Sequence, residues 1–100
     1  MRIEYDADVD ALYVRLRIGL TARTLEIDTG TLVDLDETGL ALGVEVLRPA
    51  RRWPLDETHT DELLARLRSQ AMIADDDSGL LRALMERWLT PAAAGQLLSA

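Results

Sequence analysis

The spacing of hydrophobic residues along the chain changes at Trp53–Pro54. Before this point, apolar residues recur at every second position, which is typical of strands with one buried and one solvated face. After it, they recur at helical spacing. The sequence therefore predicts an α+β fold. A β-sheet module spans residues 1–53, and a helical extension over residues 54–100 packs on the sheet, on a partner chain, or on both.

The first half contains five segments of alternating apolar and polar residues. Their apolar positions are Ile3 and Tyr5; Leu12, Val14, Leu16 and Ile18; Leu25 and Ile27; Val33 and Leu35; and Leu40, Leu42, Val44 and Val46. Between them, "DTGT" at 28–31 and "DETG" at 36–39 supply turn residues and a Gly that adopts positive φ. The short connections predict an antiparallel β-meander of about five strands, in which sequential strands are neighbours.

Two main helices are predicted in the second half. Thr60 is a candidate N-cap, and the acidic Asp61 and Glu62 that follow suit the first turn of a helix. The segment "DDDSG" at 75–79 ends this helix, and Asp77 or Ser78 caps the next. The apolar stripes are Leu63, Leu64, Leu67 and Ala71 in the first helix, and Leu81, Leu84, Met85, Trp88 and Leu89 in the second.

These stripes raise the question of what covers them. A sheet of about fifty residues has one exposed apolar face and is barely stable alone. The two helices carry more leucine than such a sheet readily buries. We therefore expect the helices to cover the sheet and a homodimer to cover the remainder.

Composition narrows the class of protein. One hundred residues suit one domain, and 48% apolar with 29% charged residues suits a soluble globular chain. Cysteine is absent, so disulfides and thiolate metal sites are excluded. The net charge of −7 argues against direct nucleic-acid binding. No segment is apolar enough for a membrane span or signal peptide, and we expect a cytoplasmic protein without membrane contact.

The acidic segment "DADVD" at 6–10 is the main candidate for chemistry. A calcium loop beginning at Asp6 would place Asp8 and Asp10 correctly, but it requires Gly where Ala11 stands and Glu where Arg17 stands. A carboxylate pair for acid–base chemistry needs a cleft that one short loop seldom provides. We favour a β-turn in which Asp6 and Asp10 bind backbone N–H groups and Asp8 is solvated.

The segments "IEYDADVDALYVRL", "ARTLEID", "LVDLDETGLALGVEVL" and "RPARR" together resemble domain-of-unknown-function family 2283, over about residues 1–53. This resemblance implies a compact β-sheet module from small bacterial proteins and no assigned activity. It also implies an antitoxin-like or regulatory role beside a toxin. Residues 54–100 lie outside the resemblance.

Other candidate sites are sparse. His59 is the only histidine, which leaves too few ligands for a typical metal site and little material for a catalytic triad. The glycines form no phosphate-binding pattern, so no cofactor is implied. The cluster "RPARRW" at 48–53 either binds an anionic partner group or forms the hinge between sheet and helices, with Arg51 and Arg52 paired to acids and Trp53 packed as a lid.

The polar side of the sheet carries charges of both signs. Its residues are Glu4, Tyr13, Arg15, Arg17, Glu26, Asp34 and Glu45. Cross-strand pairing on a solvated sheet explains this mixture. A protein-binding surface has the same character.

We therefore predict a non-enzymatic interaction module without catalytic, metal or cofactor residues, acting on a basic protein partner such as a toxin. The expected contact residues are Leu81, Leu84, Met85, Trp88, Leu89, Arg51, Arg52 and Trp53. The first alternative is a small ligand-binding protein or enzyme that uses Asp6–Asp10 with Arg15 or Arg17. The second is an acidic mimic of nucleic acid.

Overall fold

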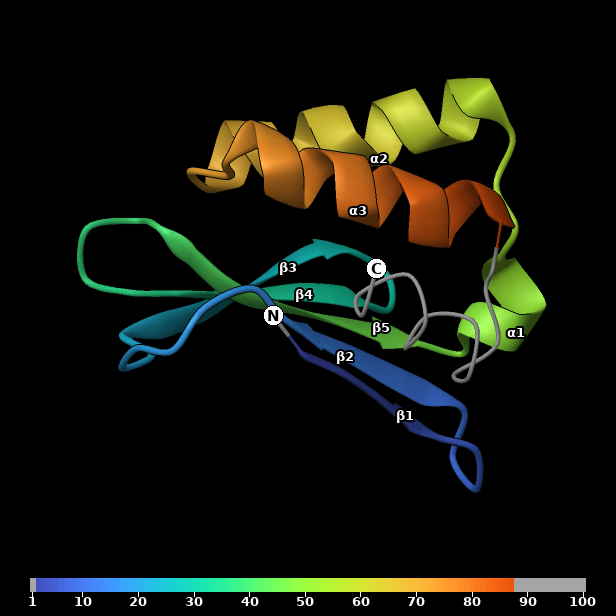
Figure 1. Ribbon diagram of the computed structural model, residues 1–100, viewed down its shortest axis with the longest axis horizontal. Helices are drawn as coiled ribbons and strands as arrows, with labels where there is room; N and C mark the ends of the chain where they lie inside the picture. The colour runs from blue at the N-terminus through green and yellow to red at the C-terminus, as the bar shows by residue number, and fades with distance from the viewer. Residues whose placement is uncertain (1, 88–100) are drawn as a thin grey trace.

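A computed structural model of the chain describes residues 2–87. These residues form two layers, a five-stranded sheet and a pair of long helices, joined by one short helix (Figure 1). This arrangement confirms the predicted α+β class and the two main helices. The elements are β1 (Arg2–Asp6), β2 (Ala11–Arg15), β3 (Arg23–Asp28), β4 (Thr31–Leu35), β5 (Ala41–Leu47), α1 (Pro49–Arg52), α2 (Glu57–Gln70) and α3 (Asp75–Arg87). None of these helices is long and apolar enough to cross a membrane.

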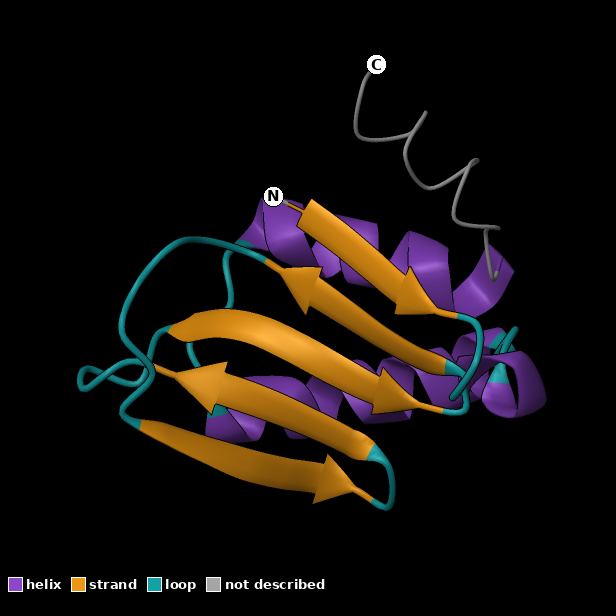
Figure 2. Ribbon diagram, turned by 90° about the horizontal axis from the view of Figure 1, so that it is seen from below, coloured by secondary structure: helices purple, strands orange, loops and turns teal. Residues whose placement is uncertain are grey.

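All neighbouring strands pair antiparallel, in the order β1-β2-β5-β4-β3. Strands that follow one another along the chain are neighbours, as expected, with one exception. The strand β5 lies between β2 and β4, so the connection from β2 to β3 passes along the end of the sheet (Figure 2). In this central position β5 is the most buried strand, with five of its seven residues buried and only one charged side chain, Glu45.

The predicted turns form where the sequence places them. Gly30, between β3 and β4, has φ of 95°, and Gly39, before β5, has φ of 92°. The carboxylate of Asp36 accepts hydrogen bonds from the backbone N–H of Thr38 (2.8 Å) and Leu40 (3.0 Å). The β4–β5 loop is thus held by the side chain at its own start.

The helix starts differ from the predicted ones. Thr60 is not the N-cap of α2, because Asp56 lies four residues earlier and its carboxylate accepts a bond of 2.7 Å from the backbone N–H of His59. Thr60 lies within the helix and is buried. Likewise the three acids Asp75–Asp77 form the first turn of α3. Acids are favourable there because they face the positive end of the helix dipole.

The helices α2 and α3 cover one face of the sheet and leave the other uncovered by the described residues (Figures 1 and 2). The core between the layers comprises Leu12, Val14, Leu16, Val33, Leu35, Val44 and Val46 of the strands and strand ends, with Leu63, Leu64, Leu67, Leu81, Leu84 and Met85 of the helices. The described leucines from which a dimer was predicted, Leu63, Leu64, Leu67, Leu81 and Leu84, are therefore buried within the chain and no longer argue for a dimer, which stays a prediction.

Hydrogen bonds fasten the helical layer at both ends. At one end, the connection between α2 and α3 pairs with the β4–β5 loop, where Met72 donates to the Gly39 carbonyl (2.9 Å) and Ala41 donates to the Met72 carbonyl (3.0 Å). At the other end, Leu55 donates to the Met85 carbonyl (2.6 Å). The position of the helices on the sheet is thus fixed by backbone contacts as well as by packing.

Candidate functional site: the uncovered sheet face

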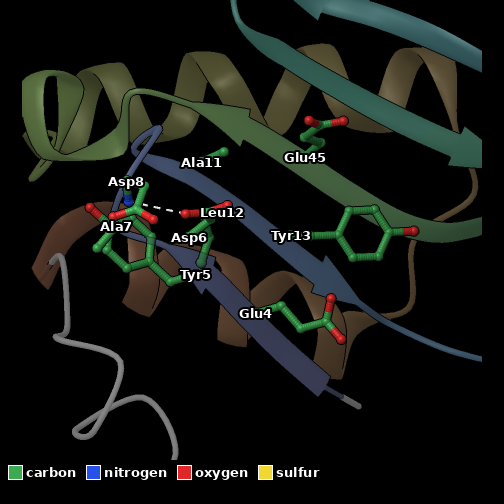
Figure 3. Close-up of a pocket in the computed structure, with 9 residues that line it drawn as sticks. All are labelled: Glu4, Tyr5, Asp6, Ala7, Asp8, Ala11, Leu12, Tyr13 and Glu45. Atoms are coloured by element: carbon green, nitrogen blue, oxygen red, sulfur yellow. Dashed lines mark hydrogen bonds between the residues drawn. The ribbon is translucent and has the colours of Figure 1, made fainter.

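The uncovered face of the sheet contains a hollow of about 590 Å³ beside the β1–β2 turn (Figure 3). Carboxylates from three segments line it, namely Glu4 and Asp6 of β1, Asp8 of the turn and Glu45 of β5. The pairing of Glu4 with Tyr13, and of Tyr13 with Glu45, places these side chains on one face. We call this the acidic hollow.

The Tyr13 side chain is held in place on this face by contacts with β5 and β4. Its ring lies across Gly43 on β5, where an added Cβ would approach the ring Cζ to 2.5 Å. Its hydroxyl donates to Asp34 on β4 (2.9 Å), whose other carboxylate oxygen accepts from Thr24 on β3 (2.6 Å). Burial, together with the bond to Asp34, raises the pKa of Tyr13 to about 12. Four strands are thus linked through one aromatic side chain.

The acidic segment forms the predicted β-turn. Asp6 accepts a hydrogen bond from the backbone N–H of Asp8 (3.0 Å), and Asp8 is exposed. Asp10 has φ of 50°, which closes the turn, and its carboxylate accepts from the Tyr5 hydroxyl (2.7 Å) and, at 3.4 Å, from the Ala50 backbone. The bond to Asp10 raises the pKa of Tyr5. Asp10 thus binds a backbone N–H group, as expected, but its shorter contact is with a side chain on β1, which was not expected.

The structure does not bring the acidic segment together with the arginines of the enzyme alternative. Arg15 lines a separate hollow with Arg2 and Ile18. Arg17 leaves the sheet face, where the sequence placed it, and forms a part-buried ion pair with Asp77 of α3 while its Nε donates to the Ala41 carbonyl (3.0 Å). Within residues 2–87, no group of three or more acidic or histidine side chains is arranged to hold a metal ion.

The cluster at 48–53 is mainly a structural joint. The Arg52 guanidinium donates to both oxygens of Asp28 (3.1 Å each), to the Thr31 hydroxyl (3.0 Å) and to the Gly30 carbonyl (3.0 Å). It therefore ties α1 to the β3–β4 hairpin. Trp53 is buried in the core, as the hinge interpretation expects, and Arg51 is exposed.

The predicted contact residues of the second helix are not a free surface. Leu81, Leu84 and Met85 are at most 1% exposed and pack against the sheet within the same chain. They are unavailable to a partner unless the helix leaves the sheet. Trp88 and Leu89 lie outside the described residues.

Two contacts in the structure were not predicted from the sequence. One is the position of Tyr13 over Gly43, for which the isolated glycine inside a strand was a signal, since such a glycine marks a close approach. The other is the burial of Asp77 against Arg17. An acid in the first turn of a helix is usually solvated, and nothing local distinguishes Asp77 from Asp75 or Asp76.

Comparison with known proteins identifies one family. A model described as "Protein of unknown function (DUF2283)" matches residues 2–48, the segment that holds all five strands. This confirms the family resemblance for that segment. No curated protein and no solved structure matches the chain. Several residues that carry the resemblance now have a structural role, because Tyr5 binds Asp10 and Tyr13 lies over Gly43.

Proposed function

We propose that this chain is a non-enzymatic protein-interaction module whose uncovered sheet face binds a basic segment of another protein. The observation that carries the proposal is the acidic hollow, because it combines four carboxylates with a fixed aromatic side chain on a face that the described helices leave open. Tyrosine is enriched in protein interfaces, and its ring face attracts arginine.

The carboxylates of the hollow are available for new ion pairs. Within the described residues, Asp6, Asp8 and Glu45 make no ion pair, and Glu4 pairs only with Arg2 (2.7 Å), with both side chains more than half exposed. An exposed pair of this kind contributes at most about 1 kcal/mol, so a partner arginine or lysine can replace it. The net charge of −7 would also speed association with a basic partner.

The partner class follows from the same charges. A basic toxin neutralised by this module is one case that fits, and a basic regulatory segment is another. The enzyme alternative has weaker support, because Asp6 and Asp8 lie apart from Arg15 and Arg17. The nucleic-acid mimic also has weaker support, since Arg2 and Arg15 interrupt the acids on this face.

A titration with a synthetic arginine-rich peptide, followed by amide chemical shifts, tests the proposal. We expect the shifts to change along β1, β2 and β5 and to leave α2 unaffected. The double substitution Glu4→Gln/Glu45→Gln should weaken binding by up to roughly 30-fold, since two exposed ion pairs are lost. The matched control is Glu57→Gln/Glu62→Gln, which removes two exposed acids from α2 with the same change in net charge. Equal weakening by both variants, or no binding by the unaltered chain, would overturn the proposal.

A further inference from the structure

The connection between β2 and β3 presents two aliphatic side chains to solvent. Ile18 is 89% exposed and Leu20 is 90% exposed, the highest values among the large hydrophobic residues that the structure describes. We call these two residues the aliphatic ridge. Single exposed hydrophobic residues are ordinary, but two on one short connection mark a candidate contact surface.

The backbone that carries the ridge is held in place on both sides. Leu16 and Arg17 donate to the Leu42 carbonyl (2.8 and 3.2 Å), and Ala22 donates to the Leu35 carbonyl (2.8 Å). Between the two ridge residues, Gly19 lies so close to the Leu42 side chain that an added Cβ would approach it to 2.9 Å. The ridge is therefore presented by a fixed loop, which lowers the entropy lost on binding.

The free charges beside the ridge differ in sign between its Ile18 end and its Leu20 end. A hollow of about 480 Å³ beside Ile18 is lined by Arg2, Arg15 and Arg17. A second hollow, of about 420 Å³, is lined by Ile18 and Leu20, by the two acids Asp36 and Glu37 of the β4–β5 loop, and by Arg17, whose charge is paired with Asp77. Hydrogen bonds to Asp36, chiefly from Thr38, lower the pKa of its carboxyl group, so Asp36 keeps its negative charge in mild acid.

We propose that the aliphatic ridge is the contact surface between two copies of this chain. A twofold interface must pair a surface with itself. Rotation by half a turn about an axis that crosses the ridge between Ile18 and Leu20 places the arginine end of one copy on the acidic end of the other. It also packs Ile18 of each copy against Leu20 of the other. Among the charged groups, Arg15 and Glu37 are exposed and make no ion pair in the described part of the chain, so they are free to pair between copies.

This interface is independent of the acidic hollow. The β2–β3 and β4–β5 loops lie at one end of the sheet, and the β1–β2 turn lies at the other (Figure 1). A dimer formed through the ridge therefore uses the Arg15 end of the uncovered sheet face and leaves the acidic hollow beside the β1–β2 turn accessible. It also differs from a dimer through the helices, whose apolar residues are already buried.

Sedimentation equilibrium of the full chain, over concentrations up to roughly 100 μM, tests the proposal; we expect a dimer with a dissociation constant on the order of micromolar. Ile18→Ser and Leu20→Ser should each weaken association about tenfold or more and leave the circular dichroism spectrum unchanged. Val9→Ser is the matched control, since Val9 is 66% exposed and belongs to the β1–β2 turn. A monomeric unaltered chain, or equal weakening by Val9→Ser, would overturn the proposal.

A charge exchange makes the test specific for the twofold pairing. Arg15→Glu and Glu37→Arg should each weaken self-association, because each places like charges opposite one another in both halves of the interface. An equimolar mixture of the two variants should associate again, since both contacts then join opposite charges. A mixture that stays monomeric would exclude this interface.

Discussion

Tyr13 and Gly43 occupy diagonal positions on neighbouring strands, which is within reach of an aromatic side chain. The glycine provides the space for the ring, and the ring covers the backbone that a glycine leaves bare. Asp34 and Thr24 then fix the hydroxyl end of the ring. One missing Cβ thus sets the shape of the outer sheet face and of the acidic hollow beside it.

Gly43→Ala should lower the free energy of unfolding by about 1–3 kcal/mol, because the new Cβ forces the Tyr13 ring away from Asp34. In a Tyr13→Ala background, the effect of Gly43→Ala on the free energy of unfolding should have the opposite sign. There, Gly43→Ala removes only the backbone freedom of glycine and should stabilise the chain by roughly 0.5–1 kcal/mol. Urea unfolding of the four proteins measures both effects. An unchanged sign in the two backgrounds would show that the ring and the glycine do not interact.

Among the elements, the strands were more predictable than the helix ends. Alternation marks each strand because half of its residues must face the core, and all five appear in the structure. Thr60 was mistaken for a cap because it precedes two acids, but Asp56 reaches the first free N–H groups of α2 better. The central position of β5 depends on which strand gains most from burial. Because this depends on segments far apart in the chain, no local sequence pattern indicates it.

The joint between the sheet and the helices depends on the side chain of Arg52. This guanidinium binds one carboxylate, one hydroxyl and one carbonyl group of the β3–β4 hairpin, and at 3.5 Å the Leu47 carbonyl of β5. A lysine at this position carries the same charge but lacks the planar fork of donors. The joint therefore depends on geometry as well as on charge.

Arg52→Lys should lower the free energy of unfolding by about 1.5–3 kcal/mol, the range for hydrogen bonds to charged groups. Arg51→Lys is the control, since Arg51 is exposed and should change stability by less than about 0.5 kcal/mol. Urea unfolding monitored by circular dichroism distinguishes the two variants. A loss for Arg52→Lys as small as that expected for Arg51→Lys would mean that the planar guanidinium is not needed to hold α1.

At the scale of the whole molecule, apolar residues divide into two groups that the sequence does not separate. Leu84 and Ile18 are both large aliphatic residues in periodic segments, yet one is fully buried and the other is 89% exposed. The difference comes from the covering of the sheet by α2 and α3. The helices take the surplus leucine into the core and leave the β2–β3 connection outside it.

This division predicts opposite effects for the two residues. Leu84→Ala should lower the free energy of unfolding by about 2–5 kcal/mol, because it removes side-chain atoms from the core and leaves a cavity. At protein concentrations where the variant remains folded, its self-association should equal that of the unaltered chain. Ile18→Ser should weaken self-association and leave the free energy of unfolding nearly unchanged, since the Ile18 side chain contacts little within the chain. Unfolding and sedimentation measurements on both variants check this, and a Leu84→Ala chain that loses self-association but not stability would place α3 at the interface.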